Sequence, residues 1–363
     1  MLRRRLVSVL VALLAGVVAG PVSLGAEFPR DQELQQVLDL RASAVRERDR
    51  EAFLSTVDPE APDFRKSQAA WFQGMVSVPI SEYSLKLAIE EWGEFTRAGD
   101  HARSGAPVVV APVEERFRIE GFDDSPAVGD LFYTFIRRSG GWVVASDSDL
   151  EDLGVVGAHQ PWEFGPVQVA RSEHFLLVAH PEEGAFVPGL LQVAEAALPP
   201  VEAVWRRPWA RRVPIFVPSG KRELERLLAA TFDVENFVAF ALSSLDREGR
   251  EGWELSGERI ILNRGNFLSH GQRSRREILT HELLHVATRG STGPFIATFV
   301  EEGLAELATG ASGTPLLDEK IRAGSFDRQI PEDFEFVSGA PDEIANAYQE
   351  SLSAMLFARE RFG

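Results

Sequence analysis

Cysteine is absent from all 363 residues of the chain, and its absence excludes several classes of protein at once. A disulfide-stabilised fold, a thiol protease and a lipoprotein anchor each need at least one cysteine. The chain also lacks the G-x-S-x-G elbow, the G-x-x-x-x-G-K-S/T phosphate loop and a paired-glycine dinucleotide fingerprint. Stability must therefore come from apolar cores and bound metal, and the chain is long enough to bury such cores.

Basic residues are in deficit, since 38 lysines and arginines stand against 55 aspartates and glutamates and give a net charge of −17. A surface of this sign repels nucleic acid and anionic lipid, so we expect no nucleic-acid partner. The total charge does not describe the charge of a local cleft, and it therefore leaves the substrate open, as it does the oligomeric state.

Long apolar runs are also absent, with one exception at the N-terminus. The string MLRRRLVSVLVALLAGVVAG pairs three arginines with an uncharged apolar stretch, and Pro21 and small residues follow it. This is the layout of a secretory signal peptide, and we predict cleavage near Ala26, with retention as a membrane anchor as the alternative. The protein is therefore expected to be secreted or to lie in the cell envelope.

Histidine is scarce, with 7 in the chain, yet two histidines lie four residues apart in the string HELLH. Chance would produce an HExxH string about once in a hundred chains of this composition. Residues four apart share a helical face, so His281 and His285 can bind a single metal ion. Glu282 projects about 100° around the helix and can take a proton from water that the metal activates. Metal-dependent hydrolysis is the chemistry that this spacing predicts.

The sequence around HELLH predicts a pair of helices. Apolar residues at helical spacing surround the motif, and Gly290 follows as a stop, which indicates a helix over residues 274–289. After a loop and a helix-starting Pro294, the run PFIATFVEEGLAELATG predicts a second helix that Gly310 terminates. The loop is long enough for the second helix to return antiparallel to the first.

The second helix offers carboxylates for the metal. A hydrolytic zinc site needs three protein ligands and an open fourth position, and the third ligand is commonly a glutamate from the next helix. The candidates are Glu301, Glu302 and Glu306.

The strings HELLHVAT and FVEEGLAE resemble the gluzincin metallopeptidases, specifically the bacterial peptidase MA-like domains. Their second motif has an aromatic residue, then Glu-Gly, a small residue and an acid, and the Glu before the Gly is the third zinc ligand. The resemblance assigns this role to Glu302 rather than Glu301, and Phe299 stands where many relatives carry Trp. Glu306, one turn beyond Glu302, would then accept the other ring N–H of a ligand histidine.

Tyr348 is the only tyrosine after Tyr133. It lies in NAYQESLSAMLFARERFG, a helical run that resembles the downstream Tyr-containing helix of peptidase MA-like domains. A tetrahedral intermediate needs a donor aimed at its oxyanion, and we expect Tyr348 to supply it. An ordinary tyrosine packed against the zinc helices is the alternative, and His270 and Arg289 are the other candidate donors.

The chain before the zinc motifs predicts a separate domain. A helix over residues 31–53 and a second helical piece over 67–75 precede strand-like segments, and Gly140 and Gly141 mark a tight hairpin. The predicted strands are residues 83–89, 108–119, 130–136 and 142–146. Helices followed by a curled antiparallel sheet resemble the cone fold of the nuclear-transport-factor-2-like domains. We expect a non-catalytic accessory module, with a small-molecule site as the alternative, because the fold alone gives no function.

The overall prediction is an α+β protein. Glycine and proline over residues 154–166 predict a linker, and β and α segments alternate after it. The expected segments are strands over 167–179, 213–217 and 258–267, and helices over 185–204 and 221–231. The expected organisation is a signal peptide (1–26), an accessory domain (27–153), the linker (154–166) and a gluzincin domain with a mixed sheet and a helix pair (167–363).

The function predicted is that of an exported zinc metallopeptidase acting on a peptide or protein substrate. His281, His285 and Glu302 would hold Zn²⁺, Glu282 would move the proton, and Glu306 would orient a ligand. A catalytically inactive, zinc-containing binding protein of the cell envelope is the alternative. A ligand-binding N-terminal domain that carries the main activity is the third hypothesis.

Overall fold

The computed structural model describes residues 29–89, 106–230, 233–246, 254–293, 296–326 and 329–362. Two compact units make up the chain: the first extends to Val169 and includes Arg226–Ala229, and the second contains Ala170–Glu225 and the residues from Ala230 onward. The architecture is α+β, as predicted. Among the described helices, none combines the length and apolar character needed to cross a bilayer. The predicted signal peptide lies outside the described residues.

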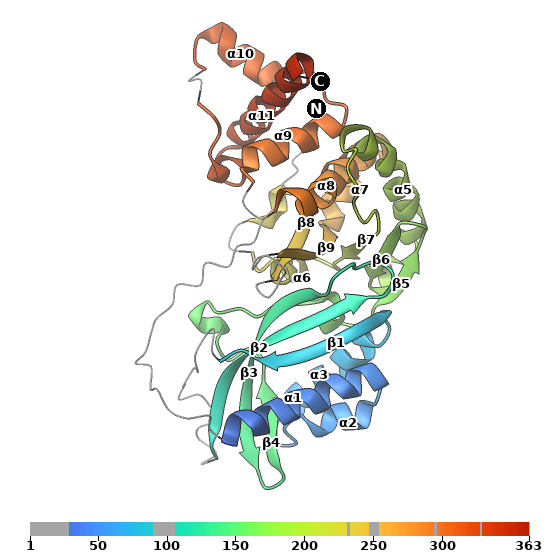
Figure 1. The fold of residues 1–363 in the computed structure, drawn as a ribbon, viewed down its shortest axis with the longest axis vertical. Coiled ribbons are helices and arrows are strands. Elements are labelled where there is room, and N and C mark those ends of the chain that lie inside the picture. The colour runs from blue at the N-terminus through green and yellow to red at the C-terminus, as the bar shows by residue number, and fades with distance from the viewer. Residues whose placement is uncertain are drawn as a thin grey trace. The chain divides into compact units, whose positions relative to one another are not determined.

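The first unit contains a curled antiparallel sheet of strand order β1-β2-β3-β4, with helices against one face (Figure 1). Buried and exposed positions alternate at the centre of β1, which is typical of a strand with one face on the core. The hairpin between β3 and β4 is tight, as predicted: Ser139 and Gly140 form its turn, and Gly141 begins β4 opposite Arg138. The strands are β1 (Ile80–Leu87), β2 (Val108–Ile119), β3 (Ala127–Arg138) and β4 (Gly141–Ser146).

The predicted helix over residues 31–53 is two helices. Arg48 adopts a φ of 58°, which ends the first helix, and the Asp49 side chain then accepts hydrogen bonds from two backbone N–H groups as the N-cap of the second. The prediction of a single helix was therefore wrong because one residue, Arg48, has a positive φ. The helices of this unit are α1 (Pro29–Glu47), α2 (Arg50–Ser55) and α3 (Pro62–Met75).

A buried arginine organises the interior of the first unit. The Arg41 guanidinium lies 4.0 Å above the centre of the Phe53 ring, and its Nη1 donates to Thr56 Oγ1 at 3.2 Å. It also bonds to the Gln68 side chain, whose Nε2 donates to Asp147 Oδ2 at 3.1 Å. We call Arg41, Thr56, Gln68 and Asp147 the Arg41 cluster. Its members come from distant parts of the sequence, so it ties helices to the end of the sheet.

The segment predicted to be a linker packs into the first unit. Trp162, from the short helix η3 (Pro161–Glu163), is fully buried and meets the Phe117 ring edge to face, with 5.5 Å between ring centres. A β-carbon at Gly74 would lie 2.7 Å from the Trp162 β-carbon, so only glycine allows this approach. Glycine and proline thus mark an irregular but packed segment here.

The second unit is built on a mixed sheet of strand order β5-β6-β7-β9-β8. Strands β6, β7 and β9 are parallel and largely buried, while β8 is the antiparallel edge strand. The predicted strand over 167–179 is two strands. The strands are β5 (Gln168–Arg171), β6 (Phe175–Ala179), β7 (Val213–Val217), β8 (Ala239–Asp246) and β9 (Glu254–Leu262).

Helices α5 (Val187–Val204) and α8 (Gln272–Thr292) pack against each other and bury a continuous apolar core on the sheet. The predicted strand over 258–267 ends early. Asn263 caps the short helix α7 (Arg264–Ser269), and its side chain accepts from the Asn266 N–H. The other helix before α8 is α6 (Lys221–Leu227).

Helix α8 continues through Gly290, so the prediction that this glycine ends the helix was wrong. The end comes at Gly293, which adopts a φ of +68° and donates its N–H to the Arg289 carbonyl at 2.9 Å. Gly293 combines this positive φ with a ψ of −174°, a conformation essentially confined to glycine, so the conformation and not the presence of a glycine ends the helix. Pro294, the predicted start of the next helix, lies outside the described residues.

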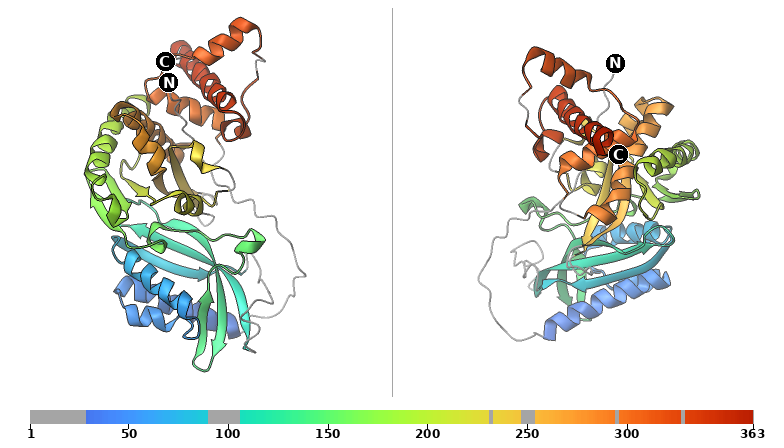
Figure 2. Two further views of the ribbon diagram at one scale, coloured as in Figure 1. Left: turned by 180° about the vertical axis from the view of Figure 1, so that it is seen from behind. Right: turned by 45° about the horizontal axis from the view of Figure 1, so that its top comes forward.

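The C-terminal helices complete the second unit. Figure 2 shows α9 and α11 packed side by side (orange and red). At their contact a β-carbon on Gly303 would lie 2.6 Å from the Ser351 carbonyl oxygen, so the two backbones approach as closely as glycine allows. The helices are α9 (Thr298–Ala308), α10 (Pro315–Ala323) and α11 (Pro341–Phe362).

Candidate metal centre

Helix α8 carries three polar side chains into the apolar core of the second unit. His281, Glu282 and His285 are all fully buried, although the helix around them packs against α5 and the sheet. The two imidazole rings face the same side, with 4.8 Å between their centres. Burying such groups is costly unless they find partners, so the partners decide what the site can do.

Helix α9 brings a carboxylate to both imidazoles. Glu302 Oε2 lies 3.0 Å from His281 Nε2 and 3.6 Å from His285 Nε2. One ligand atom from each of these residues falls within 4.8 Å of the others, and the three side chains are buried. The three residues predicted to hold a metal therefore converge.

The far nitrogens of both rings face further carboxylates of α9. Glu306 Oε1 lies 3.2 Å from His281 Nδ1, where the sequence placed it, and Glu301 Oε1 lies 3.2 Å from His285 Nδ1. Each imidazole thus directs Nδ1 to an outer carboxylate and Nε2 to Glu302. Sequence reasoning assigned no role to Glu301. Its position on the same predicted helix as Glu302 and Glu306 was the available signal. We call these two histidines and four glutamates, with Glu282 included, the histidine cluster.

Arg289 holds Glu301 from the other side. Its Nε lies 3.3 Å from Glu301 Oε1, and its Nη1 donates to Ser243 Oγ at 3.0 Å. Arg289 was one candidate for an oxyanion donor, and the structure pairs it with Glu301 and Ser243 instead. His270, the other candidate, places Nδ1 2.8 Å from the Asn266 carbonyl at the end of α7.

Glu282 has the environment of a proton carrier. Neither of its carboxylate oxygens has a hydrogen-bond partner among the described residues. Burial raises the pKa of Glu282 to about 7, with the neighbouring imidazoles opposing the rise and Glu302 adding to it. A carboxyl group with such a pKa can both take and return a proton near neutral pH.

Tyr348 reaches the cluster from α11. Its ring centre lies 6.1 Å from that of His281 and 5.3 Å from that of Phe336. The hydroxyl is buried and has no hydrogen-bond partner among the described residues. Burial first, and then the Glu302 and Glu282 carboxylates, raise the pKa of Tyr348 well above 10, so the hydroxyl keeps its proton.

The imidazoles and carboxylates strongly affect one another. Burial would lower the pKa of His281, but hydrogen bonds to Glu302 and Glu306 raise it to about 10. The carboxylates likewise raise the pKa of His285 against burial. Burial in turn would raise the pKa of Glu301, yet His285 and Arg289 lower it to about 2. Without a metal, the protonated imidazoles supply positive charge beside the carboxylates. A bound metal cation would displace these protons and supply that charge.

The donor set fits a zinc ion. Two imidazole nitrogens and one carboxylate oxygen from adjacent helices are the ligands of one group of hydrolytic zinc sites, in which a fourth position stays open. The cluster holds more carboxylates than cationic side chains, which a divalent cation would balance. The carboxylates beside both Nδ1 atoms would fix the rings with Nε2 toward the ion.

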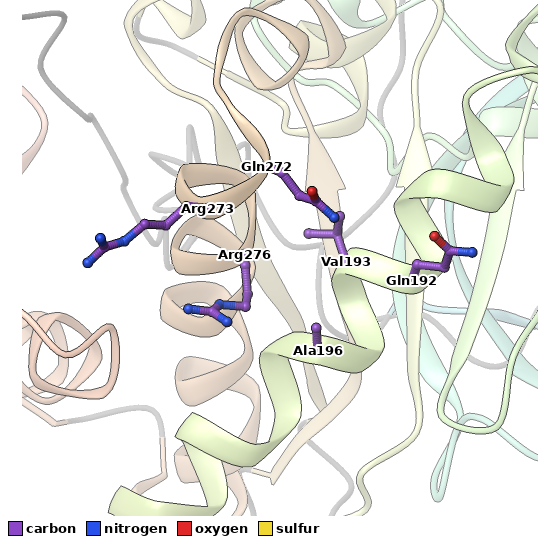
Figure 3. Close-up of a pocket in the computed structure, with 6 residues that line it drawn as sticks. All are labelled: Gln192, Val193, Ala196, Gln272, Arg273 and Arg276. Atoms are coloured by element: carbon purple, nitrogen blue, oxygen red, sulfur yellow. The ribbon is translucent and has the colours of Figure 1, made fainter.

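Other polar features of the second unit lie apart from this cluster. His174 and His180 flank β6 and pair with Glu195 and Glu223, at 2.8 and 2.9 Å. A cavity of about 350 Å³ lies between α5 and the first turns of α8 (Figure 3). At about 100° per residue along α8, Gln272 and Arg276 project to the face roughly opposite the histidines, and Arg273 projects to the side.

No protein-family model, no curated protein and no solved structure matches the chain.

Proposed function

We propose that the second unit is a zinc metallopeptidase of the gluzincin type, similar to the peptidase MA-like domains. The observation that carries this proposal is the convergence of His281, His285 and Glu302 within 4.8 Å. Glu282 lies between the two histidines on α8, and its carboxylate has no hydrogen-bond partner among the described residues. A zinc site that serves only for structure would close its coordination shell with a fourth residue and would not need Glu282.

The residues divide the work of hydrolysis between them. Zinc, when bound, supplies a Lewis acid that polarises a carbonyl and acidifies water. Glu282 takes the proton of the attacking water and returns it to the leaving amine nitrogen, since its buried carboxylate oxygens have no other hydrogen-bond partner among the described residues. The protonated hydroxyl of Tyr348 donates to the oxyanion. Glu306 accepts from His281 Nδ1 and keeps Nε2 directed inward.

The first unit is proposed as an accessory domain of the nuclear-transport-factor-2-like type. Its curled antiparallel sheet with helices against one face supports this proposal. The N-terminal signal pattern supports export to the cell envelope or beyond. The proposals of an accessory domain and of export do not depend on the proposed zinc chemistry.

The test combines metal content with turnover. Purified full-length protein should contain about one zinc per chain and cleave members of a peptide library, and a chelator should abolish the cleavage. Glu282→Gln should retain zinc and lose activity by roughly 100-fold or more, because proton transfer is lost while the ligands remain. Glu319→Gln, an exposed change on α10, is the matched control and should behave as wild type.

Two results would contradict the proposal. Cleavage by Glu282→Gln at the wild-type rate would remove the assigned proton carrier. Zinc bound with no chelator-sensitive cleavage of any peptide would instead support the inactive, zinc-containing binding protein.

A further inference from the structure

The two candidate ligand histidines are supported unequally. Each has a glutamate of α9 beside its Nδ1 at 3.2 Å, Glu306 for His281 and Glu301 for His285. Glu301 also contacts Arg289, and no ion pair between Glu306 and an arginine or lysine occurs in the described part of the chain. The side chain of Glu306 is 20% exposed, whereas that of Glu301 is 10% exposed. Water can therefore solvate Glu306 more readily than Glu301.

Arg289 is placed by the helix that carries the histidines. It follows His285 by four residues, so both side chains lie on one face of α8. Its side chain is 2% exposed, and a buried guanidinium requires a partner of opposite charge. Glu301 is that partner, and the same Glu301 oxygen lies beside both Arg289 Nε and His285 Nδ1. One carboxylate thus joins a fixed cation to a candidate metal ligand.

The contact continues to the edge of the sheet. Arg289 Nη1 donates to Ser243 Oγ at 3.0 Å, and Ser243 lies on β8, the edge strand. The pairing of β8 with β9 shifts register between Leu242 and Ser244, so Ser243 lies at an irregularity in the ladder. Such irregularities redirect a side chain out of the regular alternation.

We propose that Ser243, Arg289 and Glu301 form a chain that positions His285 for metal binding, with Arg289 as the central positioning residue. The inference rests on the proposed zinc site. It adds that the edge strand and the metal ligand are linked through a buried ion pair, while His281 depends on Glu306 without such a pair. Loss of Arg289 leaves Glu301 unpaired beside His285, and the imidazole then loses its fixed orientation.

The experiment measures zinc affinity by competition with a chromophoric chelator, using the full chain. Arg289→Gln should weaken zinc binding by about 10- to 100-fold, as expected for loss of support behind a ligand. In a Glu301→Gln background the same change should have an effect of about 3-fold or less, because the ion pair is already gone. In a Glu306→Gln background it should keep its full effect, which makes Glu306 the matched control.

A spectroscopic measurement separates positioning from a general loss of structure. Co²⁺ bound to wild type should give a visible absorption band, and Arg289→Gln should shift this band at saturating Co²⁺, since one imidazole has moved. Arg289→Lys restores the charge without the planar fork and should recover part of the affinity. The circular dichroism of the metal-free variants should match that of the wild type.

Ser243→Ala keeps the inference testable if Arg289→Gln does not fold. It should weaken zinc binding by about 3-fold, and not at all in the Glu301→Gln background, because its effect passes through Arg289. The proposal is wrong if Arg289→Gln weakens zinc binding equally in the wild-type and Glu301→Gln backgrounds. The same criterion applies to Ser243→Ala where that variant is used. Wild type that binds neither Zn²⁺ nor Co²⁺ would instead overturn the proposed function.

Discussion

The two units each bury a cluster of polar side chains, and the clusters differ in their balance of charge. The Arg41 cluster sets a guanidinium among a hydroxyl, an amide and the Asp147 carboxyl group, with the Phe53 ring beneath it. The histidine cluster gathers four glutamates around two imidazoles, with Arg289 paired to one of the four. The first arrangement contains its own cation, the Arg41 guanidinium, whereas the second has the composition of a site for a cation.

The largest expected effect is that of zinc on the second unit alone. Free Zn²⁺ at 1000 times its dissociation constant should stabilise a binding unit by about 4 kcal/mol. Hydrogen exchange should therefore slow in α8 and α9 on addition of zinc, and stay unchanged in α1 and α3. Glu302→Ala should abolish the slowing, while Arg41→Met should keep it. If zinc slowed hydrogen exchange equally in both units, the proposed difference between the two clusters would be wrong.

Removal of Arg41 should have the next largest effect. Arg41→Met leaves Gln68 and Asp147 buried without their cation and should lower the free energy of unfolding by about 3 kcal/mol, with or without zinc. Arg50→Met, an exposed change at the start of α2, is the control and should cost less than about 1 kcal/mol. Urea unfolding measures both. Similar losses in the two variants would mean that the buried arginine has no special role.

A smaller effect is expected at the contact of α9 with α11. Gly303→Ala forces a β-carbon against the Ser351 carbonyl and should cost about 2 kcal/mol, with weaker zinc binding because Glu302 is adjacent. Gly290→Ala, inside α8 with no atom within 4 Å of the new β-carbon, should instead stabilise the protein by up to about 1 kcal/mol. Thermal unfolding compares them, and a tolerated Gly303→Ala would contradict the close packing.

The smallest effect concerns the pH dependence of the Arg41 cluster. Burial, and then the Glu163 carboxylate, raise the pKa of Asp147 from 3.8 to about 6, with Arg41 opposing the rise. The folded state therefore binds the proton more tightly, and the stability that it contributes is lost as the pH rises through about 6. Wild type should lose about 1 kcal/mol between pH 5 and pH 8 relative to Asp147→Asn. Parallel pH profiles of the two proteins would show that folding does not raise the pKa of Asp147.

Local spacing predicted part of the site. Four-residue spacing places His281 and His285 on one helical face, and the predicted second helix offered three glutamates, among which the resemblance, and not spacing, selected Glu302. Most strands of the sheets were also predictable, because alternation and apolar runs depend on neighbouring residues. Glu301 and Ser243 were missed, since their partners are defined by tertiary contacts between α8, α9 and β8.

Three of the errors in the fold share one physical cause. Periodicity extends a helix or strand until something stops it, and the stops here were single residues in unusual conformations or caps. Arg48 divides the first helix with a positive φ, Gly293 rather than Gly290 ends α8, and Asn263 turns the end of a predicted strand into a short helix. Arg48 adopts a positive φ that its residue type rarely takes, and of the two glycines near the end of α8 only Gly293 takes one, so residue type alone did not identify these positions.

The close approach at Gly303 makes the final helix part of the metal centre's scaffold. The residue before it is Glu302, and the backbone that it touches belongs to the helix that carries Tyr348. A displacement of that helix would consequently disturb both the candidate third ligand, Glu302, and the proposed oxyanion donor, Tyr348. Proteolytic removal of α11, by cleavage just before residue 341, should therefore weaken metal binding as well as turnover.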